Sequence, residues 1–118
     1  MQDFRKLRVW HLSQELADEI GEVTRSFPYR QANLMDQMCS AADSVTSNIA
    51  EGCGRASKKE KAQFFHIALG SANEVDNDLV RARRTRLIGE SVYIPLRDRV
   101  FDVRKMLVSL IKRVRAGD

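Results

Sequence analysis

Apolar side chains recur along this chain at alternating steps of three and four residues, which is the spacing of one face of an α-helix. The first such series consists of Val9, Leu12, Leu16, Ile20, Val23 and Phe27. This series predicts a helix over about residues 4–26. Pro28 ends it, because a proline disfavours helical geometry in the residue before it.

Three further apolar series predict helices over about residues 33–51, 58–88 and 92–114. The second helix carries Leu34, Met38, Ala41, Ala42, Val45 and Ile49. The third carries Phe64, Ala68, Ala72, Val75, Leu79 and Ala82. The fourth carries Leu96, Val100, Val103, Leu107, Leu110 and Val114. Pro95 is compatible with the fourth helix if it lies in the first turn, where a backbone donor is not needed.

Four amphipathic helices joined by short connections predict an all-α fold, an up-down-up-down four-helix bundle that forms a single domain over residues 1–118. The chain is 43% apolar and 31% charged and has no window that approaches ~18 uncharged apolar residues, so we expect no association with a membrane. The charged start lacks the apolar core of a secretion signal, and two cysteines make no disulfide framework. We therefore expect the protein in the cytoplasm.

The segment "SNIAEGCGRASKKE", residues 47–60, separates the second and third series. It lacks the G-x-x-x-x-G-K-[ST] spacing of a phosphate loop and follows a helix rather than a strand, so a helix–helix turn is the favoured interpretation. Gly52 or Gly54 would then end the second helix in a left-handed conformation. Ser57 and Glu60 would form a capping box at the start of the third.

Asn48 and Glu51 are polar residues close to the apolar face of this segment. Buried polar groups need partners, so we interpret the two as a polar clamp that holds the turn through Arg55 or the start of the third helix. A functional site at these residues is the alternative.

The basic residues concentrate at the two ends of the predicted bundle. The chain has 20 basic and 16 acidic residues, a net charge of +4, which permits nucleic-acid binding without requiring it. The candidate phosphate contacts are Arg55, Lys58, Lys59, Arg81, Arg83, Arg84, Arg86, Lys112, Arg113 and Arg115. For each of them the alternative is a solvated face or a helix C-terminus whose dipole favours cations.

Aromatic and apolar residues also lie off the main stripes. Trp10, Phe64 and Phe65 could stack on bases, although rings at helical spacing are more often core or subunit contacts. The off-stripe residues that favour assembly are Trp10, Met35, Phe65, Ile67, Val80, Met106 and Ile111.

No constellation of catalytic residues is recognisable. His11 and His66 are far apart and lack a second ligand at helical spacing, and we expect His66 to be partly buried. Cys39 and Cys53 are expected to be small core residues. We therefore expect no enzymatic activity, no metal and no cofactor.

Several of these motifs resemble the four helix bundle protein family, which is also called the 23S rRNA intervening sequence protein or ribosomal protein S23 family. The resemblance runs from about residue 4 to residue 110 and rests on "VW" at 9–10, "FP" at 27–28, the segment 47–60, and "FFHIALGSANEVDNDL" at 64–79. The family signature corresponds here to Asn48, Ile49, Ala50, Glu51, Gly52, Gly54, Arg55, Ser57, Lys59, Glu60, Gly70, Ser71 and Glu74.

The resemblance implies a four-helix bundle that assembles as a homopentamer without enzymatic activity. A related branch, the accessory variability determinant proteins of diversity-generating retroelements, consists of basic pentamers that bind nucleic acid and work with a reverse transcriptase. The resemblance therefore favours an oligomeric bundle that binds RNA or DNA electrostatically through its basic ends, with a reverse transcriptase as one possible protein partner. The alternative is a pentameric scaffold or adaptor that binds a protein and no nucleic acid.

Overall fold

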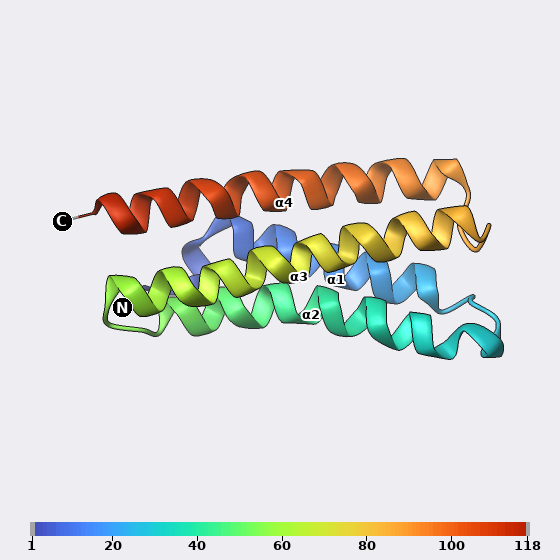
Figure 1. Cartoon of the computed structure of the whole chain (residues 1–118), viewed down its shortest axis with the longest axis horizontal. Helices are drawn as coiled ribbons and strands as arrows, with labels where there is room; N and C mark the ends of the chain where they lie inside the picture. The colour runs from blue at the N-terminus through green and yellow to red at the C-terminus, as the bar shows by residue number, and fades with distance from the viewer. Residues whose placement is uncertain (1, 118) are drawn as a thin grey trace.

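The computed structural model describes residues 2–117, which form an elongated bundle of about 49 × 21 × 20 Å (Figure 1). Its elements are η1 (Phe4–Lys6), α1 (Arg8–Thr24), η2 (Tyr29–Gln31), α2 (Ala32–Cys53), α3 (Lys58–Arg84) and α4 (Glu90–Ala116), where η marks a short 3-10 helix. Over residues 2–117 there is no strand, so the predicted all-α fold is confirmed.

Consecutive helices run in opposite directions (Figure 1). The two chain ends and the α2–α3 turn lie at one end of the bundle, which we call the terminal end. The α1–α2 and α3–α4 connections lie at the other, which we call the distal end. Each helix packs against the helices next to it in the sequence, and α1 also packs against α4, which closes the bundle. This is the predicted up-down-up-down topology.

The predicted apolar stripes form the core, with one shift. In α3 the fully buried aromatic ring belongs to Phe65, whereas Phe64 is half-buried, so the prediction that Phe64 begins the stripe was wrong. Ile111 is also buried inside the chain. The off-stripe side chains that remain well exposed on α3 are Ile67 and Val80.

Two helix boundaries differ from the prediction. The expected first helix is divided because Leu7 is extended (φ −87°, ψ 122°), and α1 begins only at Arg8. The expected third helix ends at Arg84 instead of residue 88, because the chain turns there. As a result α4 begins at Glu90, which places Pro95 in the second helical turn rather than the first.

The α2–α3 turn is held by the cap at Ser57. The Glu60 amide donates to Ser57 Oγ at 3.1 Å, while the Ser57 hydroxyl donates to the Glu60 carboxylate at 3.2 Å. No glycine of the described chain has a positive φ, so the expected left-handed end at Gly52 or Gly54 is wrong. Gly52 serves a different purpose: a Cβ there would lie 2.6 Å from Phe65 Cε1, so its lack of a side chain lets α3 approach α2.

No helix of residues 2–117 is both long and apolar enough to cross a membrane.

Candidate nucleic-acid interface

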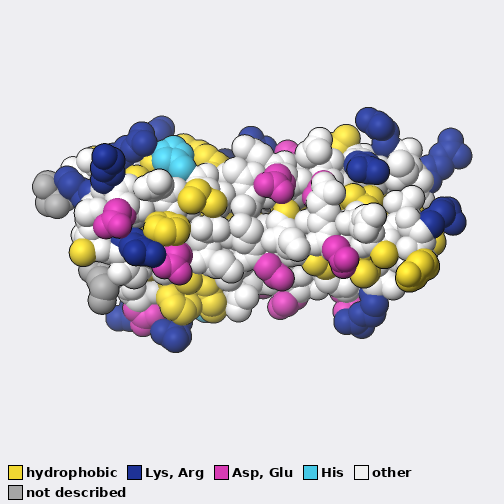
Figure 2. Space-filling model, turned by 60° about the horizontal axis from the view of Figure 1, so that its bottom comes forward, with side chains coloured by type: hydrophobic (Ala, Val, Ile, Leu, Met, Phe, Trp, Pro, Cys, Tyr) yellow, Lys and Arg dark blue, Asp and Glu magenta, His cyan; other side chains and the backbone are white. Residues whose placement is uncertain are grey.

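Basic side chains gather at both ends of the bundle, and acidic side chains lie mainly between them (Figure 2). The terminal end holds Arg5, Lys6, Arg8, Arg55, Lys58, Lys59, Lys61, Lys112, Arg113 and Arg115. The distal end holds Arg25, Arg30, Arg81, Arg83, Arg84, Arg86, Arg97 and Arg99. The antiparallel topology therefore brings together cations that are far apart in the sequence.

At the terminal end, three of the six predicted phosphate contacts are engaged within the chain. Arg55 Nη2 lies 2.7 Å from Glu51 Oε2, and its guanidinium carbon lies 4.7 Å from the centre of the Phe64 ring. Lys58 Nζ donates to the backbone carbonyl of Gly117. Arg115 Nη2 contacts the ring of His66 at 3.0 Å, and His66 is exposed rather than partly buried as expected. Lys59, Lys112 and Arg113 are exposed.

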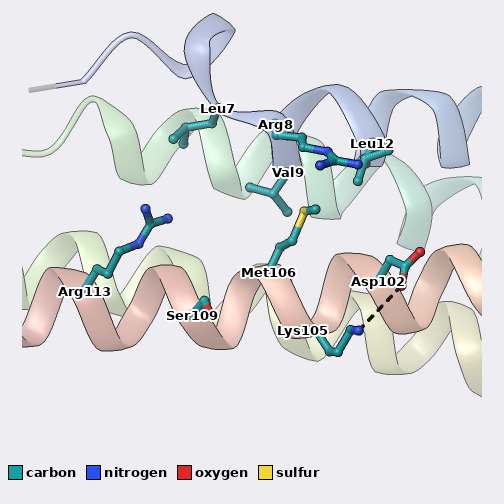
Figure 3. A pocket seen from close by; sticks show the side chains of 9 residues that line it. All are labelled: Leu7, Arg8, Val9, Leu12, Asp102, Lys105, Met106, Ser109 and Arg113. Carbon is teal, nitrogen blue, oxygen red and sulfur yellow. Dashed lines mark ion pairs between the residues drawn. The ribbon is translucent and has the colours of Figure 1, made fainter.

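A second feature of the terminal end is a hollow of about 660 Å³ between the start of α1 and the second half of α4 (Figure 3). It exists because Leu7 leaves helical geometry, so that α1 is short beside α4. In Figure 3 the Met106 side chain points across it toward Val9. Arg113, a predicted phosphate contact, lies at the edge of this hollow. Its guanidinium can therefore also contact a ligand that binds on the α1 side.

At the distal end the predicted arginines are not paired. Arg81, Arg83, Arg84 and Arg86 form no ion pair within residues 2–117. Three of them line a hollow of about 390 Å³, which we call the distal hollow. Its lining residues are Val80, Arg83, Arg84, Arg86 and Tyr93. None of these residues is acidic and the three arginines form no ion pair with any other described residue, so this hollow presents unpaired guanidinium groups to an anionic ligand.

Arg86 also has an unusual backbone. Its φ is 63°, in the left-handed region that favours glycine. The amide of Arg86 donates to the Arg83 carbonyl at 3.1 Å and the amide of Leu87 donates to the Ala82 carbonyl at 2.9 Å. These are the two bonds of a Schellman motif, in which glycine usually occupies the position of Arg86. An arginine in this conformation strains the backbone, and residues strained in this way cluster at packing or binding sites that hold them in place.

Arg86→Gly is therefore expected to raise the free energy of unfolding by about 0.5–1 kcal/mol, because glycine adopts the left-handed conformation without strain. Denaturant titration measures the change. Arg81→Gly, which places the same substitution inside α3, serves as the control and should lower stability by about 1 kcal/mol. If both variants lose stability equally, the strain at Arg86 is absent.

Polar residues form a ladder along the seam between α2 and α3. From the distal to the terminal end, its two rungs are Gln37 with Asp78 (2.8 Å) and Ser44 with Ser71 (2.8 Å), seven residues apart in both helices, as expected for antiparallel left-handed packing. Seven residues further along, Glu51 pairs with Arg55, whose guanidinium lies over the Phe64 ring. The ladder fixes the register of α2 against α3.

Comparisons with known proteins give the family. The chain matches the model of the 23S rRNA-intervening sequence protein over residues 5–109. The chain belongs to the 23S rRNA-intervening sequence protein family. A protein of unknown function from the S23 ribosomal protein family of Bacteroides thetaiotaomicron has a similar crystal structure, with a TM-score of 0.79 and 24% sequence identity over 88% of this chain and 98% of that chain. Among curated proteins the comparison gives no match.

Most residues of the 23S rRNA-intervening sequence protein signature lie at the end of α2, in the α2–α3 turn or in the first turn of α3. Asn48 was expected to reach Arg55 or the third helix, but its amide donates within α2, to Ser44 O at 2.8 Å and Ser44 Oγ at 3.0 Å. The other half of the expected clamp, Glu51 with Arg55, is confirmed, although Glu51 is exposed. Gly70 and Glu74 lie outside this region: both are exposed in the middle of α3, and nothing lies within 4 Å of a Cβ added at Gly70. In this chain the signature therefore lies mainly at the α2–α3 turn and the helix ends beside it.

The most deeply buried group of this ladder is the Asp78 carboxylate. Asp78 is 1% exposed, and its Oδ2 atom has no hydrogen-bond partner. Burial raises the pKa of Asp78, as does the nearby Glu74, while the hydrogen bond from Gln37 and the charge of Arg81 lower this pKa. The charged form is thus disfavoured in the folded state.

Asp78→Asn is expected to raise the free energy of unfolding by about 1 kcal/mol at neutral pH, because it removes a buried charge and keeps an acceptor for Gln37. The wild-type pKa is raised on folding, so the wild type loses stability as pH rises through that pKa, and the gain from the amide should disappear below the unfolded pKa of about 3.9. Thermal melts at several pH values test this. The exposed Asp18→Asn is the control. A difference in stability between wild type and Asp78→Asn that stays the same at all pH values would contradict this prediction.

The aromatic candidates make contacts within the chain, as the favoured interpretation of their helical spacing expected. Phe65 is fully buried, Phe64 lies under Arg55, and the Trp10 ring packs against Phe4 at a centroid distance of 4.9 Å. Tyr93 was missed, although it is half-buried in the wall of the distal hollow. Its position directly after the α3–α4 turn was the available signal, because that turn carries the densest group of arginines.

Proposed function

We propose that this protein binds RNA or DNA through the basic ends of a self-associating helical bundle, with the distal arginines as the principal contacts. The observation that carries the proposal is the distal hollow, where Arg83, Arg84 and Arg86 lack internal ion pairs and line one concave surface without an acidic residue. Such a surface suits phosphate, because each guanidinium can donate two parallel hydrogen bonds to its oxygens.

The proposed role is binding rather than catalysis. Among residues 2–117, no group of three or more His, Cys, Asp or Glu side chains could hold a metal ion. The terminal end would add weaker contacts through Lys59, Lys112 and Arg113, which are exposed. Affinity from such contacts is largely sequence-independent and falls steeply with salt, because each neutralised phosphate releases counterions.

The test is fluorescence anisotropy of labelled structured RNA and duplex DNA, titrated with nuclease-treated protein at low and at moderate salt. We expect submicromolar binding at low salt that weakens by at least tenfold at moderate salt. Absence of binding at low salt would reject the nucleic-acid role. The ratio of RNA to DNA affinity would indicate the natural ligand class.

Self-association is supported by a groove between α3 and α4. This groove of about 420 Å³ is lined by Leu69, Asn73, Phe101, Arg104, Lys105, Val108 and Ser109. Phe101 is 55% exposed and Val108 is 40% exposed, although both are large apolar side chains. Exposed apolar side chains grouped in this way are typical of interaction sites.

The distribution of charge between the helices favours a second copy as the occupant of this groove. Helices α1 and α2 carry seven acidic side chains and one basic one, whereas α3 and α4 carry thirteen basic and seven acidic ones. The α1–α2 half of one copy is therefore complementary in charge to the α3–α4 half of another. A contact between two different surfaces generates a ring when the rotation from one copy to the next closes, and five copies is the number that the family resemblance implies.

The double variant Phe101→Ser and Val108→Ser is expected to shift the protein toward the monomer, because it removes the apolar part of the groove while leaving the core intact. Light scattering during size-exclusion chromatography measures the mass. Tyr29→Ser is the control, since Tyr29 is 94% exposed but lies outside the groove. A wild-type monomer would reject self-association and favour the second candidate, a scaffold whose groove binds a different protein.

That second candidate has its own test. A pull-down after nuclease treatment that retains a stoichiometric protein partner, such as a reverse transcriptase, in the wild type but not in the groove variant would support the scaffold role.

A further inference from the structure

The distal hollow combines features that a simple phosphate surface does not need. Its wall contains the ring of Tyr93, and beside it lies Val80, which is 41% exposed. A duplex keeps the faces of its bases stacked inside the helix, so it offers no base face to a surface of this kind. An aromatic ring between arginines would then have no base on which to stack.

The Tyr93 ring is fixed in place. It packs against the apolar core from the second turn of α4, and the guanidinium carbon of Arg97 lies 5.7 Å from the ring centroid. A half-buried ring of this kind loses little freedom when a ligand stacks on it. Stacking on aromatic side chains, with arginines beside them on the backbone, is how proteins hold unpaired nucleotides.

The backbone at Arg86 contributes to the same site. Its left-handed conformation ends α3 and turns the chain toward α4, so that Arg83 and Arg84 from α3 and Tyr93 from α4 line one hollow. The dipole of α3 favours cations in its last turn, but it does not account for an arginine in a strained position or for a neighbouring aromatic ring.

We infer that the distal hollow binds single-stranded nucleic acid, with one unpaired base stacked against Tyr93 and the flanking phosphates on Arg83, Arg84 and Arg86. This inference rests on the proposed function and narrows it to a ligand class. RNA and DNA share the chemistry that it uses, namely a base with a free face and a phosphodiester on each side.

The test compares oligouridine and oligothymidine of about 12 nucleotides with duplexes of the same length, by anisotropy at moderate salt. We expect the single strands to bind about tenfold more tightly than the duplexes. Tyr93→Leu should remove about tenfold of the single-strand affinity and leave duplex affinity unchanged, whereas Tyr93→Phe should retain wild-type binding. Tyr29→Leu is the control, because this ring lies at the distal end but outside the hollow.

The outcomes distinguish a failure of this inference from a failure of the proposed function. Equal binding of single strands and duplexes, unaffected by Tyr93→Leu, overturns the inference and leaves the proposed function standing. Binding of neither, when the titration is repeated at low salt, overturns both. Tighter binding of single strands than of duplexes supports the inference. A preference for oligouridine would then indicate RNA as the ligand, and a preference for oligothymidine would indicate DNA.

A second measurement does not depend on the folding of a variant. Photocrosslinking of a single strand that carries 5-iodouracil should label the tryptic peptide of residues 87–97, in which Tyr93 is the sole aromatic residue. Crosslinks confined to other peptides would overturn the inference.

Discussion

Gly52→Ala is expected to lower the free energy of unfolding by about 1–3 kcal/mol, the usual cost of overpacking a core. The added Cβ would lie 2.6 Å from Phe65 Cε1, 2.9 Å from Phe65 Cδ1 and 3.2 Å from the Cβ of Phe64. The Phe65 ring has no free space into which to move, because it is fully buried. Either α3 moves away from α2 or the ring leaves its position, and both changes disturb the seam between α2 and α3.

Two variants make the origin of this loss measurable by urea titration. Gly21→Ala is the matched control, because an added Cβ there meets nothing within 4 Å inside a helix, and it should raise stability by up to about 1 kcal/mol. Phe65→Leu in the Gly52→Ala background should recover part of the loss, so that the double variant is less unstable than the sum of the two changes. Additive losses would mean that Gly52 and Phe65 do not compete for space.

The sequence predicted the helices well because the apolar series are long and each helix buries one continuous stripe. It was less successful where two neighbouring residues have similar hydrophobicity. Phe64 and Phe65 both fit the spacing, and in the structure Phe65 enters the core and packs closely over Gly52 of α2. The break at Leu7 was missed for a related reason, because its extended geometry leaves no mark in the apolar pattern.

The candidate site was predictable in its charge and not in its geometry. The antiparallel topology follows from short connections, so the two basic ends could be assigned before the structure was known. Whether an arginine forms an ion pair depends on which residue lies one helical turn away. Arg55 has Glu51 one turn before it, whereas Arg83 and Arg84 have no acidic residue at that distance. The contribution of Tyr93 depends on the left-handed turn at Arg86, and nothing in the residue type predicts that turn, because glycine is the usual occupant.

The variant that replaces Arg83, Arg84 and Arg86 with Gln is expected to weaken nucleic-acid binding by about tenfold to a hundredfold at low salt. It should also make the slope of log affinity against log salt shallower by about three, close to one for each lost phosphate contact. Folding should be preserved, because Arg84 and Arg86 are exposed, Arg83 is half-buried, and none of them forms an ion pair within the described chain. Circular dichroism checks the fold, and anisotropy across a salt series measures the slope.

The matched control removes the same charge from arginines that are already paired. In Arg5→Gln, Arg25→Gln and Arg99→Gln, each replaced guanidinium contacts a carboxylate in the wild type, at 3.4, 3.5 and 2.7 Å. If affinity depends only on net charge, both triple variants will bind equally weakly, and the distal hollow is not the site. If it depends on unpaired guanidinium groups arranged on one surface, the control will keep most of its affinity and its salt slope, because its arginines contribute little to phosphate binding in the wild type.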